Sequence, residues 1–186
     1  PPFPVLRAIE IIERSTGHPL KESFREFDQK PIGSASLSCV YKARLHRGES
    51  VAVKVRRPGV VPQLAADIRA LGWLLQLGEW LSLFKPGFTR NLRSELGGML
   101  FEEIDFVREA RNAEVFRLEA ERYEQHQISA PRVYFDLSSE DVLVAEFVTG
   151  TFLNEIIQAL DTKDTAALAE IRGRGIDIFF RRPVFL

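Results

Sequence analysis

The feature that most constrains this chain is a lysine inside a short strand pattern at residues 51–55, Val-Ala-Val-Lys-Val. Small β-branched residues around Lys54 favour a β-strand, and Pro58 with Gly59 ends the run. A lysine fits poorly in a plain buried strand. Two interpretations are open: an edge-strand lysine that faces solvent, or a lysine that has a chemical role.

Composition limits the classes of protein that this chain can represent. Its 186 residues carry a formal net charge of −1 with a pI near 6.4, which gives no reason to expect nucleic-acid binding. Cys39 is the only cysteine, so an internal disulfide framework is excluded and a reducing compartment is expected. The apolar stretch 70–84 contains Gln76 and Glu79, which indicates a buried helix rather than a membrane span.

The order of the expected elements predicts an α+β fold with an antiparallel five-stranded sheet. Strands are expected at 27–33, 37–45, 50–55, 131–137 and 141–148. Helices are expected at 5–14, 20–27, 61–83, 89–125, 152–160 and 165–180. Two side chains of the 61–83 helix, Trp73 and Trp80, are expected in core or helix–helix contacts, and Cys39 is expected to serve packing.

A loop of small residues lies between the first two predicted strands, where a protein kinase has its glycine-rich loop. The kinase pattern is G-x-G-x-x-G-x-V, and its three glycine positions hold Gly33, Ala35 and Ser38 here. Small residues let backbone N–H groups approach phosphate oxygens. Val40 follows at the position that would cover an adenine, and Ala52 would share that surface. Small residues also fill ordinary hairpin turns, so the loop alone is weak evidence for a kinase-like site. Its spacing to Lys54 is what supports that interpretation.

A kinase-type lysine needs an acidic partner on the long helix that follows. At about 100° per residue, Glu103 falls in the middle of the apolar face of the 89–125 helix, whereas Asp105 and Glu109 point away. Because a carboxylate buried alone costs several kcal/mol, Glu103 should have a cationic partner. Lys54 is the candidate, and a structural pair with an arginine elsewhere is the alternative.

The last kinase-like element is the hydrophobic run 142–150, which ends in Glu-Phe-Val before Thr149 and Gly150. It resembles the hinge between two kinase lobes, where the Glu146 carbonyl and the Val148 N–H would bond adenine. Taken alone, the run is a hydrophobic strand and a turn.

Several motifs together resemble the signature of the UbiB (AarF-type) family of atypical kinase-like proteins. Residues 31–43 are similar to its P-I-A-A-A-S-I-A-Q-V-H-R-A loop, and residues 53–59 are similar to V-K-V-x-R-P-G. Residues 103–113 resemble its E-x-D-F…E-A-x-N motif, and residues 133–150 resemble its second strand pair and hinge. Residues 1–17 match its P-P-F-P…I-I-E…G segment, so the resemblance covers nearly the whole chain.

The resemblance implies a protein-kinase-like ATPase or kinase linked to ubiquinone (coenzyme Q) biosynthesis, with Lys54 and Glu103 as its catalytic pair. The residues it implies for nucleotide binding are Gly33, Ser34, Ala35, Ser36, Val40, Ala52, Lys54, Glu146 and Val148. ATP with Mg²⁺ is the implied cofactor, with no metal ligand in this chain. An isoprenoid lipid or ubiquinone-biosynthesis proteins are implied as further partners. The expected location is the cytoplasm, peripheral to a membrane only through segments outside this chain.

The chain departs from the family pattern at several positions. Gly33 and Ser34 replace two loop alanines, Cys39 replaces a glutamine, and Tyr41 replaces a histidine. Ala145 stands where a larger residue such as Met is usual, which should widen the back of the adenine pocket.

The catalytic half of a kinase has no counterpart in these residues. The family's K-x-G-Q motif, the H-x-D…H-P-G-N loop and a D-F-G motif are missing, and residues 104–106 are not a D-F-G because they lie in a predicted helix. Three parts are expected: a helical extension (1–26), a kinase-like N-lobe with its hinge (27–150) and the first helices of a C-lobe (151–186). The 186 residues alone are expected to bind nucleotide weakly at best and not to turn it over.

Two other functions remain open. One is a small-molecule phosphotransferase with the same core lobe, against which the E-x-D-F…E-A-x-N pattern argues. The other is a pseudokinase-like module that docks a lipid or a biosynthetic complex.

Overall fold

The computed structural model describes residues 3–83, 88–124, 128–150, 153–162 and 164–173. Its elements are α1 (Val5–Thr16), α2 (Leu20–Ser23), β1 (Glu26–Phe27), β2 (Gly33–Ser34), β3 (Ser38–Arg44), β4 (Ser50–Arg56), α3 (Val60–Trp80), α4 (Phe88–Glu103), α5 (Phe106–Arg122), the 3₁₀ helix η1 (Phe135–Leu137), β5 (Val142–Glu146), α6 (Leu153–Asp161) and α7 (Thr165–Gly173). The parts of the predicted helices at 125, 152 and 174–180 lie outside the described residues.

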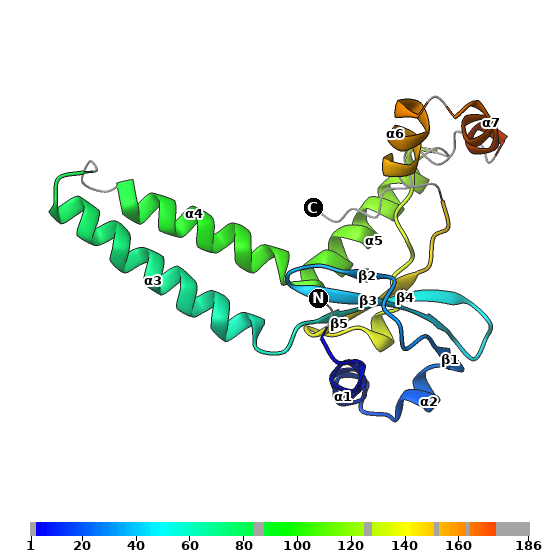
Figure 1. The fold of residues 1–186 in the computed structure, drawn as a ribbon. Helices are drawn as coiled ribbons and strands as arrows, with labels where there is room; N and C mark the ends of the chain where they lie inside the picture. Colours follow the sequence, from blue (N-terminus) through cyan, green and yellow to red (C-terminus); the bar gives the residue numbers. More distant parts are fainter. Residues whose placement is uncertain (1–2, 84–87, 125–127, 151–152, 163, 174–186) are drawn as a thin grey trace.

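The predicted antiparallel sheet of five strands is confirmed, with the strand order β1-β3-β4-β5 and β2 paired with the start of β3 (Figure 1). The single strand expected at 27–33 is wrong, because residues 28–32 lie outside any strand and separate the two short strands β1 and β2. The strand expected at 131–137 is wrong: Val133 forms an isolated bridge with Ala145, and η1 follows. A serine side chain takes the backbone partners that a strand would use. The Ser138 hydroxyl donates to the Tyr134 carbonyl (2.8 Å) and accepts from the Val144 N–H (3.0 Å).

The main core lies on the sheet face that carries the odd-numbered residues of β4. Val51, Val53 and Val55 are fully buried there, whereas the even-numbered residues between them are half-buried on the opposite face. Helix α1 packs Ala8, Ile11 and Ile12 into this core, so the N-terminal helix is part of the same packed body. Cys39 is fully buried in the core, which confirms the packing role predicted for it.

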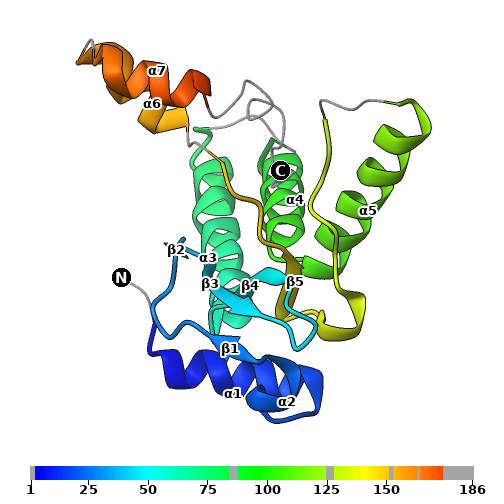
Figure 2. The same ribbon diagram turned by 90° about the vertical axis from the view of Figure 1, so that its right-hand side faces the viewer.

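Helix α5 packs on the opposite sheet face, as the turned view shows (Figure 2). Phe106 and Ala110 from this helix form a second small core with Val133 and with Leu143 of β5. Because α1 and α5 cover opposite faces, the face beside α5 is the one that carries Lys54.

The single helix predicted over 89–125 is wrong, because the helical run breaks between Glu103 and Phe106. Asp105 takes a non-helical conformation and caps α5, its carboxylate accepting from the Arg108 N–H at 2.9 Å. Ile104 and Phe106 are both buried, although in one continuous helix their side chains would point about 200° apart. The break lets both side chains reach the interior.

Helices α3 and α4 lie side by side as a hairpin that projects from the sheet (Figure 1). Small residues allow the close approach, since Gly72, Gly78 and Gly97 are buried and a Cβ on Gly97 would meet Ile68 at 3.9 Å. The prediction of a buried helix is wrong here: Trp73 is 74% exposed and Trp80 is 80% exposed. Their helix face lies on the outside of a projecting hairpin. None of the described helices combines the length and apolar content needed to cross a membrane.

Candidate functional site

The centre of the site is an ion pair between Lys54 on β4 and Glu109 on α5. The Lys54 Nζ donates to both carboxylate oxygens of Glu109, at 2.7 Å and 3.0 Å. Both side chains are largely buried, with 17% and 12% of their surface exposed. The ammonium group also lies 4.7 Å from the centre of the Phe106 ring, within cation–π range. Lys54 is therefore a largely buried lysine, paired with a carboxylate and next to an aromatic ring. It is not an edge-strand lysine that faces solvent.

The predicted pairing of Lys54 with Glu103 is wrong. Glu103 is the last residue of α4 and is exposed, whereas Glu109 lies one turn into α5. Because the helix breaks at Asp105, the angular positions of residues in α5 do not continue those of α4. The rotation of about 100° per residue, applied across the break, therefore put Glu103 and Glu109 on the wrong faces. Within α5 alone, Glu109 stands three residues after Phe106 and one before Ala110, both of which are buried.

The electrostatics of Glu109 reflect two opposed effects. Burial raises the pKa of its carboxyl above the ordinary value, and the charge and hydrogen bonds of Lys54 lower it part of the way back. The net direction is upward. Desolvation of the carboxylate thus outweighs the attraction of the neighbouring ammonium group.

The small-residue loop lies at the hairpin turn between β2 and β3. Ala35 N–H donates to the Ser38 carbonyl (2.9 Å), and the Arg57 side chain donates to the Ala35 carbonyl (2.9 Å) and to the Ser34 hydroxyl (3.0 Å). The backbone N–H groups of Ser36 and Leu37 donate no hydrogen bond to any described residue. Two amide donors at the turn are thus available to an anion.

The two residues expected to cover a base lie on the same sheet face as Lys54. Val40 on β3 is directly opposite Lys54, and Ala52 precedes Lys54 by two residues on β4. Ala145 on β5 is opposite Ala52. All three of these apolar residues are half-buried, which leaves a shallow apolar surface next to the ion pair. Gly33 adopts no positive φ, and a Cβ there would make only ordinary contact with Val40 at 3.9 Å.

The predicted hinge follows the end of β5. Glu146 N–H donates to the Arg132 carbonyl (2.8 Å), on the side of β5 away from β4, and Phe147 N–H donates to the Ser50 carbonyl (3.0 Å). The Glu146 carbonyl and the Val148 N–H have no hydrogen-bond partner in the part of the chain that the structure describes. Among the described residues, nothing occupies the two groups that would bond adenine.

Sequence reasoning missed Glu109, Phe106 and Arg57 as neighbours of the site. A signal for the first two was present, because Asp105 is a good N-cap residue and a helix that begins there puts Phe106, Glu109 and Ala110 on one side. Lys42 was also missed. It shares the Lys54 face and lies 4.7 Å from the centre of the Phe147 ring.

The arrangement can hold a polyanionic ligand with a planar apolar part. Lys54 supplies a cation, the turn supplies two amide donors, and Val40 with Ala52 supplies apolar contact. Across the described ranges, no group of three or more His, Cys, Asp or Glu side chains gathers in a way that could hold a metal ion.

Comparison with known proteins gives consistent matches. The family described as ABC1 atypical kinase-like domain matches residues 1–184. A protein named "Probable protein kinase UbiB" from Pseudomonas putida (strain GB-1) is 36% identical over 185 residues, covering 97% of this chain and 33% of its own. "Protein ACTIVITY OF BC1 COMPLEX KINASE 7, chloroplastic" from Arabidopsis thaliana is 34% identical over 156 residues, covering 84% of this chain and 22% of its own.

A solved structure also matches. It is described as "The complex structure of Rv3197-erythromycin from Mycobacterium tuberculosis" and has a TM-score of 0.69 at 29% sequence identity. The match covers 88% of this chain and 40% of that chain. Against the two curated relatives above, this chain spans 33% and 22% of their length.

Proposed function

Because this chain belongs to the ABC1 atypical kinase-like family, we propose that its sheet forms the ATP-binding lobe of a UbiB-type kinase or ATPase. The observation that carries the proposal is the Lys54–Glu109 pair, at 2.7 Å, on the same sheet face as Val40 and Ala52. In kinase-like folds a strand lysine held by a helix glutamate reaches the nucleotide phosphates. Glu109 takes the role that was predicted for Glu103.

Each part of a nucleotide would have a partner among the residues of this lobe. Lys54 would contact the phosphates together with the N–H groups of Ser36 and Leu37. Val40 and Ala52 would cover the base, and the backbone of residues 146–148 would bond its edge. Bound Mg²⁺ would supply charge neutralisation at the phosphates. We expect its ligands, and the residue that orients the nucleophile, in the part of the family's proteins that lies outside these 186 residues.

The biological setting is proposed from the names of the relatives. The curated relatives named UbiB support a role in ubiquinone biosynthesis, with an isoprenoid lipid or biosynthetic proteins as further partners. A cytoplasmic location stays a prediction from the sequence. The geometry of the site supports nucleotide binding alone.

The test is a titration of the full-length protein with a fluorescent ATP analogue, with and without Mg²⁺. We expect Lys54→Ala and Glu109→Gln to weaken binding about 10-fold or more, since each removes a charge-assisted contact at the phosphate side. Glu103→Gln is the matched control, because it neutralises an exposed glutamate six residues away. Equal affinity in all four proteins would refute the assignment.

The same titration separates the competing functions. A kinase or ATPase should bind the analogue more tightly with Mg²⁺ and release phosphate in the full-length protein. A pseudokinase-like module should bind without turnover. A small-molecule phosphotransferase should turn ATP over only when an acceptor such as an aminoglycoside or choline is added.

A further inference from the structure

Arg57 links the end of the lysine strand to the small-residue turn. Its Nε donates to the Ala35 carbonyl (2.9 Å), and its Nη2 donates to the Ser34 hydroxyl (3.0 Å). Its backbone N–H donates to the Leu37 carbonyl (2.9 Å). One residue thus makes hydrogen bonds to three residues of the turn, Ser34, Ala35 and Leu37.

We propose that Arg57 is a positioning residue that holds this turn in the conformation that receives the nucleotide phosphates. The inference rests on the proposed nucleotide-binding function. It adds a residue that would not touch the nucleotide but would set the direction of the groups that do.

The chemical reason lies in the carbonyl of Ala35. A turn presents both N–H groups and carbonyl oxygens, and a carbonyl directed at a phosphate would repel it. The Ala35 carbonyl is occupied by Arg57, while the N–H groups of Ser36 and Leu37 donate to none of the described residues. The guanidinium therefore removes an acceptor from the turn and leaves its donors available.

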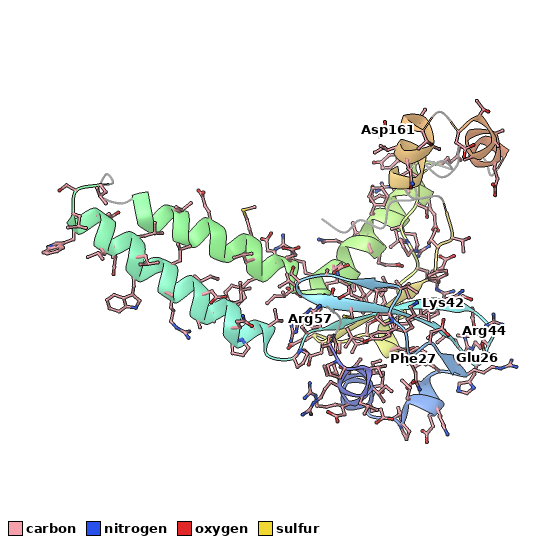
Figure 3. All side chains as sticks on the ribbon, viewed as in Figure 1. Glu26, Phe27, Lys42, Arg44, Arg57 and Asp161 are labelled. Atoms are coloured by element: carbon pink, nitrogen blue, oxygen red, sulfur yellow. The ribbon has the colours of Figure 1, made fainter. Side chains whose placement is uncertain are left out.

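The position of Arg57 in the sequence also relates the 34–37 turn to Lys54. Arg57 follows Lys54 by three residues, directly after β4, and Lys54 pairs in register with Val40 at the far end of the turn. Figure 3 shows Arg57 at the end of the sheet where the α3–α4 hairpin begins, opposite the end that carries Arg44. Strand β4 thus carries Lys54, which would contact the phosphates, and is followed directly by Arg57, which holds the turn.

Burial does not force these contacts. Arg57 is only half-buried and lines a cavity of about 560 Å³ at the start of α3, so water can solvate its guanidinium. The guanidinium carbon also lies 5.7 Å from the centre of the Phe3 ring, within cation–π range. A half-exposed arginine that nevertheless aims two donors at one turn is consistent with a positioning role.

The decisive substitution is Arg57→Lys. A lysine keeps the charge but has no planar fork, so it cannot satisfy the Ala35 carbonyl and the Ser34 hydroxyl in the same geometry. Ser34→Ala removes the second acceptor alone. Arg44→Lys is the matched control, because Arg44 is likewise an arginine at the end of a strand region but contacts Glu26 at the other end of the sheet.

The experiment measures the affinity of the full-length protein for ATP and, separately, for adenosine, each by competition with a fluorescent ATP analogue. We expect Arg57→Lys to weaken ATP binding about 10-fold and Ser34→Ala about 3-fold, with the double variant no weaker than Arg57→Lys. Adenosine affinity and the melting temperature without ligand should stay as in the wild type, because adenosine does not use the phosphate turn.

The outcomes are separable. If Arg57→Lys lowers ATP and adenosine affinity equally, or lowers only the melting temperature, Arg57 is a general structural residue and the positioning role is refuted. If Arg57→Lys binds ATP like the wild type while Lys54→Ala does not, the positioning role fails and the proposed function survives. If the wild type binds no ATP, the proposed function itself fails.

Discussion

Lys54 and Glu109 form their ion pair across 55 residues of chain, and the whole α3–α4 hairpin lies between them. The strand that carries the lysine is fixed by the main core, while the helix that carries the glutamate is fixed by the second, smaller core. The pair therefore adds a polar contact between two layers that the second core also joins, through Phe106 and Ala110 of α5 and Leu143 of β5.

Removal of the glutamate should destabilise the fold as well as weaken ligand binding. We expect Glu109→Ala to lower the free energy of unfolding by about 1–3 kcal/mol, since a largely buried ammonium group loses its carboxylate. Urea denaturation measures the change. Glu103→Ala, at an exposed position, should change it by less than about 0.5 kcal/mol. A larger effect at Glu103 than at Glu109 would contradict the observed pairing.

The titration of Glu109 should be visible directly. Its pKa is raised by burial, so the folded protein binds this proton more tightly than the unfolded chain does. The contribution of Glu109 to the free energy of unfolding therefore falls as pH increases from below its ordinary range through the raised pKa. Carboxyl ¹³C NMR should find this pKa above that of an exposed glutamate. Lys54→Met should move it further up, and a downward move would exclude Lys54 as the group that lowers it.

Tyr41 offers a stabilising substitution. Its ring is fully buried and stacks on Phe27 with centroids 5.2 Å apart, but its hydroxyl has no hydrogen-bond partner within the described ranges. Tyr41→Phe removes a buried, unsatisfied polar atom and should raise the free energy of unfolding by about 1 kcal/mol. Calorimetry should show a higher Tm. Tyr134→Phe, at a half-buried tyrosine, is the control, and a lower Tm for Tyr41→Phe would reveal a partner for the hydroxyl.

The start of α5 should depend on Asp105. Asp105→Ala removes the side-chain bond to the Arg108 N–H and should cost about 1 kcal/mol, whereas Asp105→Ser should keep most of the stability. Hydrogen exchange at the Arg108 amide reports the loss locally, with faster exchange expected in the alanine variant. Unchanged exchange in both variants would show that the carboxylate is not the cap.

Much of the sheet and of the site could be predicted because it depends on local pattern. Alternation of buried and half-buried residues around Lys54 identifies the strand, and the spacing from Val40 to Lys54 is the consequence of a register that pairs them directly. The burial of Cys39 follows from the same alternation along β3.

Glu109 and the exposed tryptophans could not be predicted in the same way. The partner of Lys54 depends on where one helix ends and the next begins, and a single capping residue, Asp105, decides that phase. The exposure of Trp73 and Trp80 depends on where a hairpin projects, which no local period encodes. The apolar character of their helix is indeed that of a buried one, so only the tertiary arrangement distinguishes the two cases.

The break at Ile104 and Asp105 has a consequence for how chains of this kind can change length. Within a continuous helix, deletion of one residue from α4 would rotate everything after it by about 100° and turn the glutamate away from the lysine. Because α5 restarts at its own cap, a deletion or insertion in the hairpin is absorbed before Phe106. The hairpin can thus be shortened, extended or re-aimed while the carboxylate of Glu109 stays in register with Lys54.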